Sequence, residues 1–162
     1  MTPSKPSGPP DPPSDPGRST TSWTIPEPAD VLSYAYLWAD EAATGQDEGL
    51  KDRPVVVVVA RVVAGERTEL FVAPVSHSTA TLGDGIEIPP RVKQHLGLDD
   101  ETSWIVATEL NRFTWPGPDI RLVPDGDTPV YGAIPAKLFE QLRQAISEHA
   151  EANRMRIPKR TE

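Results

Sequence analysis

The segment from Pro54 to Ala60 constrains the fold of this chain most, because five consecutive valines follow a proline. β-Branched side chains favour the pleated backbone of a strand and pack well on it. The run is short and bounded by charged residues, so it predicts a strand rather than a helix. Its apolar residues fall on both alternating faces. We therefore expect a central strand that is covered on both sides.

Arg53 immediately precedes this strand, and we expect it at the rim where the buried strand emerges. A guanidinium held beside a rigid strand presents a planar fork of donors that suits a phosphate group. The alternative interpretation is a solvated arginine or a surface ion pair with Asp52, because most charges in loops are solvated.

The composition limits the classes of protein that this chain can belong to. Its 162 residues are typical of one domain, and it has no cysteine, which excludes disulfides and thiolate sites and is compatible with a reducing cytoplasm. No apolar run suits a signal peptide or a membrane span, so we expect a soluble, cytoplasmic protein with no membrane partner. The net charge of −8 argues against broad, sequence-independent binding of nucleic acid but leaves a local basic groove open.

Three regions follow from changes in composition along the chain. Residues 1–22 are rich in proline and serine and predict a disordered tail, with a proline-rich ligand segment as the alternative. Residues 23–150 carry the apolar patterns of a folded domain. Residues 151–162 lose the helical period and predict a frayed polar tail.

The patterns within the domain predict a mainly β fold with some helix. Alternating or β-branched stretches predict strands at 30–38, 55–60, 68–75, 86–88, 103–107 and 113–115, and a polar loop at 39–52. The first of these stretches also suits one face of a helix. Turn residues around Gly65, at 64–67, predict that the second and third strands form a hairpin or meander. Pro90 begins a short helix that Gly97 ends, and Pro135 begins a closing helix. Leu138, Leu142 and Ile146 give that last helix an amphipathic character.

Several kinds of site are poorly supported by the sequence. The histidines His77, His95 and His149 lie far apart and lack ligands at helical spacing, so we expect no metal ion. There is no glycine-rich phosphate cradle and no dinucleotide fingerprint, so we expect no nucleotide cofactor. Ser76 lacks the flanking glycines of a nucleophile elbow, which argues against a serine hydrolase.

The remaining candidates for chemistry lie at the ends of predicted strands. Arg53 begins one strand, Ser76 and His77 end its neighbour, and Glu109-Leu110-Asn111-Arg112 follows another. Antiparallel neighbours place the start of one strand beside the end of the next. We therefore expect Arg53 and Ser76 to share one edge of the sheet.

From about Asp30 to Leu142 the chain resembles the PemK/MazF-type toxins of bacterial toxin–antitoxin systems. The motifs that carry the resemblance are Arg53-Pro54 before the valine strand, Val72-Ala73-Pro74-Val75-Ser76-His77-Ser78, and Glu109-Leu110-Asn111-Arg112-Phe113-Thr114-Trp115. Ser103-Trp104-Ile105-Val106 leading to Trp115-Pro116-Gly117-Pro118-Asp119 is similar to a PemK-like subgroup of plasmid-maintenance proteins.

The resemblance implies both a fold and an activity. The fold is an SH3-like (CcdB/PemK-like) small barrel of about five to seven strands with a C-terminal amphipathic helix, usually in a homodimer. The activity is a metal-independent endoribonuclease that cleaves single-stranded RNA to a 2′,3′-cyclic phosphate, inhibits growth and is held inactive by a cognate antitoxin.

The same resemblance matches Arg53 and Ser76 to the arginine and the hydroxyl residue that similar proteins use. Arg53 would stabilise the charge of the transition state, Ser76 would hold a phosphate oxygen, and His77 would carry protons. The family more often has threonine at the position of Ser76, and this departure, together with His77, leaves substrate preference open. The alternatives are a hydroxyl that forms a turn at Ser76 and an exposed loop histidine at His77.

Candidate substrate-binding residues are Lys51, Asn111, Arg112 and Trp115. Trp115 is either a base-stacking surface or part of the core. The alternative function is a catalytically inactive PemK-like barrel that acts as a binding or interaction module, which the acidic charge and the scattered basic residues favour.

Overall fold

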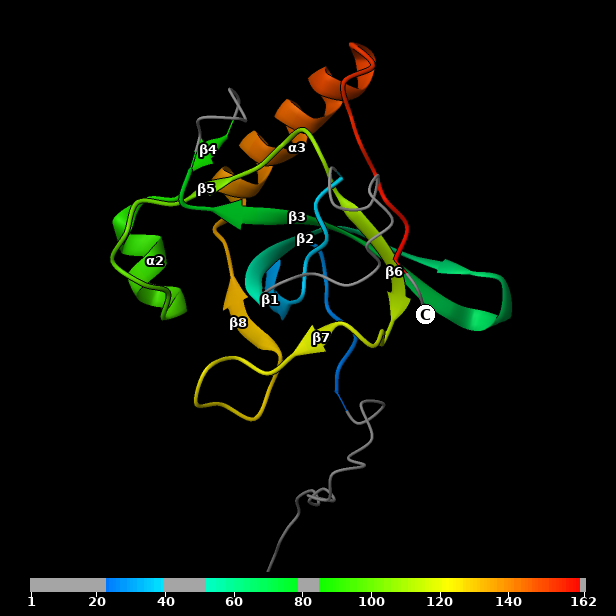
Figure 1. Cartoon of the computed structure of the whole chain (residues 1–162), viewed down its shortest axis with the longest axis horizontal. Coiled ribbons are helices and arrows are strands. Elements are labelled where there is room, and N and C mark those ends of the chain that lie inside the picture. Colours follow the sequence, from blue (N-terminus) through cyan, green and yellow to red (C-terminus); the bar gives the residue numbers. More distant parts are fainter. Residues whose placement is uncertain (1–22, 40–51, 79–84, 161–162) are drawn as a thin grey trace, which may run out of the picture.

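The computed structural model describes residues 23–39, 52–78 and 85–160 (Figure 1). The expected tail at 1–22, most of the polar loop at 39–52 and Lys51 lie outside these ranges. The described elements, in chain order, are β1 (Asp30–Tyr34), β2 (Arg53–Val63), the 3₁₀ turn η3 (Ala64–Glu66), β3 (Arg67–Ser76), β4 (Ile86–Glu87), α2 (Pro90–Leu96), β5 (Trp104–Ile105), β6 (Asn111–Trp115), β7 (Ile120–Arg121), β8 (Val130–Ala133) and α3 (Ala136–Glu151).

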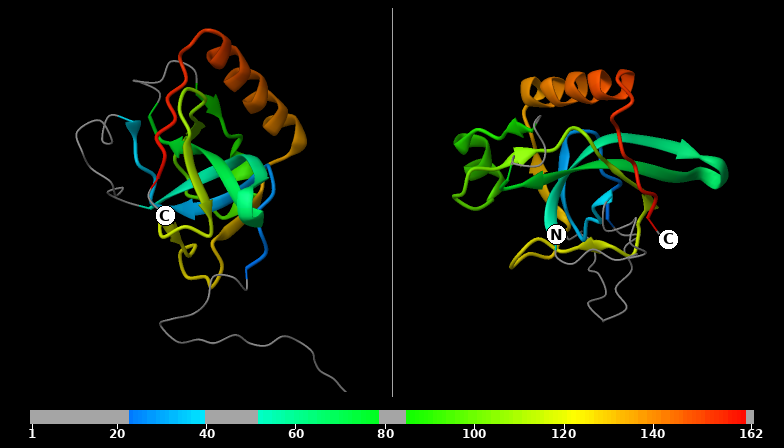
Figure 2. Two further views of the ribbon diagram at one scale, coloured as in Figure 1. Left: turned by 90° about the vertical axis from the view of Figure 1, so that its right-hand side faces the viewer. Right: turned by 45° about the horizontal axis from the view of Figure 1, so that its top comes forward.

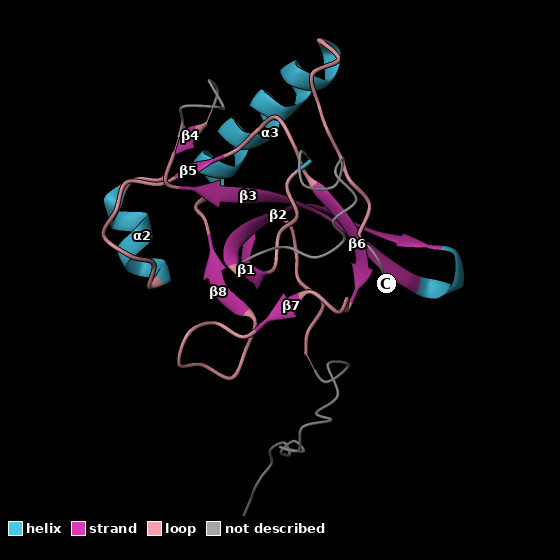
Figure 3. Cartoon of the chain, in the orientation of Figure 1, coloured by secondary structure: helices cyan, strands magenta, loops and turns pink. Residues whose placement is uncertain are grey.

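The strands form one open antiparallel sheet in the order β4-β5-β3-β2-β1-β7 (Figure 3). In addition, β6 pairs with the first half of β3, and β8 pairs with β1. The expectation of a mainly β fold with a closing helix is confirmed. The sheet has eight strands within the described residues rather than five to seven, because the sequence patterns did not reveal β7, which has only two residues, or β8, which has four and contains Gly132.

β2 is the central strand that the valine run predicts. It lies between β1 and β3, with Val56 opposite Val31 on one side and Val55 opposite Pro74 on the other. Val55 and Val57 pack in one core cluster with Tyr34 and Phe113, and Val56 and Val58 pack in the opposite cluster with Leu138 and Leu142. Burial of each such side chain contributes about 1.5–3 kcal/mol. The two-sided burial confirms the prediction from the valines.

Beyond its bulge between Val57 and Val59, β2 continues with β3 as a hairpin that projects from the body of the sheet (Figure 2). Gly65 makes the turn with a φ of 78°, a conformation that glycine adopts without steric cost. The expected hairpin is therefore confirmed, although Val62 near its tip is 72% exposed.

Both expected helices are present. α2 begins at Pro90, and Gly97 ends it in the left-handed conformation. α3 follows Pro135 and buries Leu138 and Leu142 against the sheet, which it crosses on one face (Figure 2). Within the described ranges, no helix is long and apolar enough to cross a bilayer.

The first strand is shorter than expected and ends at Tyr34. The backbone N–H of Ala35 donates to the carbonyl of Asp119 at 2.9 Å, and that of Leu37 donates to Asn111 Oδ1 at 2.9 Å. These partners are a loop carbonyl and a side chain, so the N–H groups of Ala35 and Leu37 are satisfied without a neighbouring strand. The alternating aromatic pattern does not distinguish the two arrangements, because Tyr34 inside the strand and Tyr36 beyond it are both buried.

The segment after α3, residues 154–160, lies beside β6 instead of fraying, and we call it the C-terminal strap. The N–H of Leu110 donates to Arg156 O at 2.9 Å, and the N–H of Arg160 donates to Arg112 O at 2.8 Å. Arg160 is only 2% exposed: its guanidinium donates to Ala35 O at 2.7 Å and pairs with Asp119 at 2.9 Å. The expectation of a frayed tail fails here because one arginine finds buried partners, which no period in the sequence reveals.

Candidate functional site

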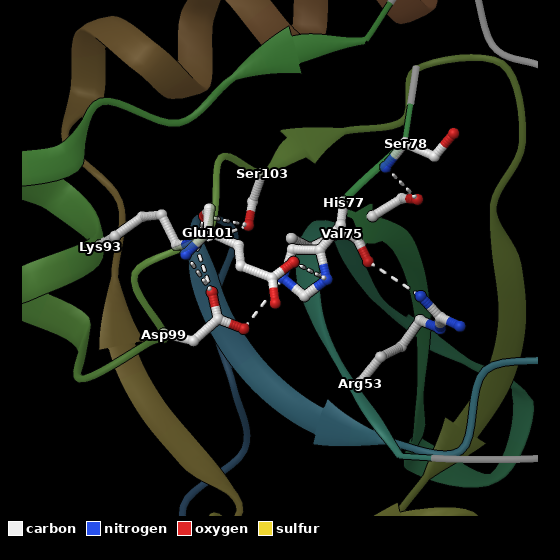
Figure 4. Close-up of polar contacts among 9 residues, drawn as sticks. Arg53, Val75, His77, Ser78, Lys93, Asp99, Glu101 and Ser103 are labelled. Atoms are coloured by element: carbon white, nitrogen blue, oxygen red, sulfur yellow. Dashed lines mark hydrogen bonds and ion pairs between the residues drawn. The ribbon is translucent and has the colours of Figure 1, made fainter. Parts of the chain in front are cut away.

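Arg53 lies where the start of β2 meets the end of β3. Its Nη1 donates to the carbonyl oxygen of Val75 at 3.2 Å (Figure 4). The guanidinium carbon lies 5.1 Å from the ring centroid of Trp38, a geometry that attracts a cation to the ring face. The neighbouring Asp52 carboxylate lies 3.3 Å from Arg121 Nε. Arg53 and the end of β3 thus share one edge of the sheet, as expected, and the half-buried guanidinium is held by a carbonyl and an aromatic ring.

A pocket of about 420 Å³ opens beside Arg53. It lies between the β2–β3 edge, the loop after α2 and β8. The described residues that line it are Asp52, Arg53, Pro54, Val75, His77, Gly97, Leu98, Asp99, Ser103, Pro124 and Tyr131. The pocket therefore combines one arginine, one histidine, two carboxylates and one tyrosine, and can hold a ligand that carries both an anionic group and hydrogen-bond donors.

A second hollow, of about 700 Å³, lies along α2 and is lined in part by Lys93. Its walls include Pro89, Pro90, Gln94 and Thr102. None of the residues that the sequence singles out for chemistry lines this hollow, so the smaller pocket is the candidate site.

Ser76 and His77 end β3 at this edge. Ser76 Oγ accepts a hydrogen bond from the N–H of Ser78 at 3.1 Å, as in the turn-forming alternative. The His77 ring lies between two carboxylates: Nε2 is 2.9 Å from Asp99 Oδ2, and Nδ1 is 3.5 Å from Glu101 Oε1 (Figure 4). The carboxylates orient the ring, so His77 must release one of them before it can exchange a proton with a ligand.

A buried lysine holds the loop that carries these carboxylates. Lys93 Nζ donates to Asp99 Oδ1 at 2.6 Å, to Ser103 Oγ at 2.7 Å and to the carbonyl of Glu101. The hydrogen bond from Lys93 is the main reason that the pKa of Asp99 is lowered, and the charge of His77 adds to it. A lysine in a short polar helix is expected to be solvated, so sequence reasoning misses this buried role. The signal for it is the place of Lys93 one helical turn before the buried Leu96, on the same face of α2.

This pairing predicts a pH-dependent contribution of Asp99 to stability. Because the native pKa is lowered, the contribution is complete above the ordinary pKa of an aspartate and is lost as the pH falls through the native value. Asp99 is half-exposed, so Asp99→Asn is expected to lower the free energy of unfolding at neutral pH by about 1 kcal/mol or less. Urea unfolding at about pH 7 and about pH 2 measures the difference, which should be smaller at the lower pH.

The exposed neighbour Asp100 supplies the matched control, because Asp100→Asn removes the same charge from the same loop. This control should change stability by less than about 0.5 kcal/mol at either pH. A deficit of Asp99→Asn that persists undiminished in acid would contradict the assignment.

The structure does not bring the other candidate residues to the pocket. Asn111 is fully buried, and its amide donates to Leu37 O at 2.8 Å, so it has no surface for a substrate; its role is to fix the segment after β1. Trp115 is 7% exposed, and its ring centroid lies 6.3 Å from that of Trp23. It therefore belongs to the core, which is one of the two alternatives that the sequence left open. Arg112 Nε lies 3.7 Å from Glu69 Oε2 on the far half of β3. Lys51 is outside the described residues.

In the ranges that the structure describes, no group of three or more His, Cys, Asp or Glu side chains is arranged to hold a metal ion. Positive charge at the pocket comes from the half-buried Arg53 and, when it is protonated, from His77. The chemistry that these residues support is therefore binding of an anion such as a phosphate diester, together with proton transfer.

The chain matches no family model and no curated protein. The resemblance to PemK/MazF-type toxins thus rests on the motifs in the sequence. The function has to be argued from the site itself.

Proposed function

We propose that the chain is a metal-independent endoribonuclease that cleaves single-stranded RNA and is the toxin of a toxin–antitoxin pair. The observation that carries the proposal is the position of Arg53, which lines a pocket together with His77 and is held at the end of β3, where Ser76 lies. A positioned guanidinium in a partly desolvated site stabilises the negative charge that develops on a phosphate during cleavage.

The reaction needs only groups of the substrate and these three side chains. The ribose 2′-oxygen bonds to the adjacent phosphorus and the bond to the 5′-oxygen breaks, leaving a 2′,3′-cyclic phosphate and a 5′-hydroxyl. The Arg53 guanidinium stabilises the negative charge that the phosphate gains in the transition state, and the Ser76 hydroxyl binds a non-bridging oxygen of that phosphate. His77, oriented by Asp99, takes the proton of the 2′-hydroxyl and then gives it to the leaving 5′-oxygen.

The same proposal includes an SH3-like barrel as the fold, and a second copy of the chain and an antitoxin as the partners. An SH3-like barrel is supported by the way β3 pairs with β6 in its first half and with β5 in its second half, as strands do in a curled sheet. A homodimer, a cognate antitoxin and a cytoplasmic location follow from the family resemblance. Sedimentation at micromolar concentration tests the dimer, and a clean monomer would remove it.

The second candidate function is a catalytically inactive module of the same fold that binds a partner. The contacts of both ring nitrogens of His77 with carboxylates favour it, since a proton carrier needs one nitrogen facing the substrate. The net charge of −8 also favours it, because long RNA is repelled.

The direct test is cleavage of single-stranded RNA by purified, antitoxin-free protein. We expect products that end in a cyclic phosphate and rates that EDTA leaves unchanged, because the reaction requires no metal ion. Cleavage that depends on added metal would contradict the mechanism, and no cleavage of any RNA would favour the binding module.

Ser76→Ala is expected to lower the cleavage rate by about tenfold, the scale of one neutral hydrogen bond to the reacting phosphate. Initial rates on the same RNA measure the loss. Ser147→Ala, at an exposed position on α3, is the control and should cleave as the unmodified protein does. Equal rates for the two variants would show that the hydroxyl serves only the turn to Ser78.

A further inference from the structure

The sequence motif Glu109-Leu110-Asn111 leads into β6, and its two polar side chains are buried. Glu109 is 7% exposed, and Asn111 is completely buried. Both side chains hydrogen bond with the segment 35–39, which follows β1 and lies at least 70 residues earlier in the chain. Burying a carboxylate and an amide is costly unless they are hydrogen-bonded, so these contacts hold the segment in one place.

The two side chains fix the backbone on both sides of Trp38. Asn111 accepts a hydrogen bond from the N–H of Leu37 at 2.9 Å and donates one to its carbonyl oxygen at 2.8 Å. Glu109 Oε1 accepts from the N–H of Ala39 at 2.9 Å. Trp38 therefore lies between two residues whose backbone groups are bonded to buried partners.

The same carboxylate also orients the indole ring of Trp38. The Tyr36 hydroxyl donates to Glu109 Oε1 at 3.0 Å, and the Tyr36 ring meets the Trp38 ring edge to face, with the centroids 5.2 Å apart. Burial raises the pKa of Tyr36 well above its ordinary value, and Glu109 adds to this effect. The phenol thus keeps its proton and remains a hydrogen-bond donor.

Trp38 in turn supports Arg53. The guanidinium carbon lies 5.1 Å from the Trp38 ring centroid, and Nη1 donates to Val75 O at 3.2 Å. The hydrogen bond alone would let the guanidinium turn about it, whereas an aromatic face beneath the cation favours one orientation. Arginine binds a phosphate through a planar fork of donors, so this orientation decides whether two N–H groups can meet two phosphate oxygens.

We propose that Trp38 is a positioning residue that sets the orientation of the Arg53 guanidinium. Glu109 and Asn111 form the clamp that holds Trp38 in place. The inference rests on the proposed function for the identity of the anion, a phosphate of single-stranded RNA. It gives the Glu109-Leu110-Asn111 motif a role in the site without contact with the substrate. A misplacement of about 1 Å can lower a rate by about 100-fold, so the clamp should affect kcat.

The first test compares the kinetics of single-stranded RNA cleavage by variants of the full chain. Trp38→Leu should lower kcat about tenfold and change KM less than about twofold, because the guanidinium is present but no longer oriented. Trp38→Phe restores an aromatic face and should recover most of the rate. Phe71→Leu is the matched control: the Phe71 ring centroid lies 5.3 Å from the Arg61 guanidinium carbon, outside the residues that line the pocket, so kcat should not change.

A double-mutant cycle separates positioning from a general loss of structure and from direct contact of Trp38 with the substrate. In the Arg53→Ala background, Trp38→Leu should lower the residual rate by less than about twofold, because its effect passes through the guanidinium. A full tenfold loss in that background would overturn the inference.

Substitutions of Glu109 and Tyr36 test the clamp. Glu109→Gln keeps an acceptor oxygen and should retain kcat within about threefold, whereas Glu109→Ala should lose as much as Trp38→Leu. Tyr36→Phe removes only the hydroxyl and should lower kcat about threefold. Full rates in Glu109→Ala and Tyr36→Phe would remove the clamp. Thermal melts show whether Glu109→Ala folds, and if it does not, Tyr36→Phe decides alone.

Titration with inorganic phosphate, followed by tryptophan fluorescence, tests the inference without cleavage. An anion at Arg53 offsets the positive charge beside the indole ring, so the unmodified chain should show a saturable change in emission. The change should disappear in Trp38→Phe and in Arg53→Ala, and Phe71→Leu should keep it.

The two kinds of measurement distinguish the inference from the proposed function. A phosphate signal that requires both Trp38 and Arg53, in a protein that cleaves no RNA, would support the inference and overturn the proposed function. RNA cleavage that requires Arg53 but not Trp38 would overturn the inference and leave the proposed function standing. The absence of both signal and cleavage would overturn both.

Discussion

Replacing Arg53 with alanine is expected to lower the rate of single-stranded RNA cleavage by a factor of about 100 or more. That is the scale of losing one positioned electrostatic group from a transition state. Ser76 offers only a neutral hydroxyl, and His77 is engaged with carboxylates, so neither side chain replaces the guanidinium. Initial rates on an unstructured RNA, with the variant at matched concentration, measure the loss.

Two further variants make the result specific. Arg53→Lys keeps the charge but loses the planar fork and the stacking on Trp38, and it should recover only part of the activity. Arg143→Ala removes an exposed cation from α3 and should have no effect. A fall in activity that is matched by a fall in the melting temperature of Arg53→Ala would point to misfolding instead of lost catalysis, and full activity would remove Arg53 from the mechanism.

Arg160→Ala is expected to lower the free energy of unfolding by about 3–5 kcal/mol, the cost of removing one partner from a buried ion pair. The guanidinium is almost completely buried, pairs with Asp119 at 2.9 Å and lies 5.5 Å from the ring centroid of Tyr34. Its loss also removes a donor from Ala35 O. Equilibrium unfolding in urea measures the change.

The control is Lys159→Ala in the same C-terminal strap. Lys159 is exposed, so its removal takes away one positive charge without leaving a buried group unpaired. We expect a change within about 0.5 kcal/mol. Equal, small effects of both substitutions would mean that the strap is a surface segment with little bearing on stability.

Much of the fold could be predicted from local pattern. The valine run identified the central strand, Gly65 the hairpin turn, and the proline and glycine positions the limits of α2. The shared edge of Arg53 and β3 followed as well, because antiparallel pairing fixes which strand ends meet.

The residues whose positions the sequence did not predict are mainly polar side chains that bind partners far away along the chain. Arg160 hydrogen bonds with a carbonyl 125 residues away, and Asn111 with one 74 residues away. A polar side chain in a short sequence window is expected to be exposed, and only the tertiary partner reverses that expectation. Trp115 lies in the core, and the aromatic residue that lines the pocket is Tyr131, which β8 carries there.

The five valines that make β2 a good central strand also make it a hazard while the chain is unfolded. The strand requires pairing with both β1 and β3, and β-rich sheets of this kind form slowly, so the apolar segment stays exposed until both neighbours arrive. Arg53 and Arg61 stand near its two ends as charged gatekeepers against intermolecular β stacking. Besides its place at the pocket of the folded protein, we therefore expect the Arg53 guanidinium to disfavour aggregation of the nascent chain.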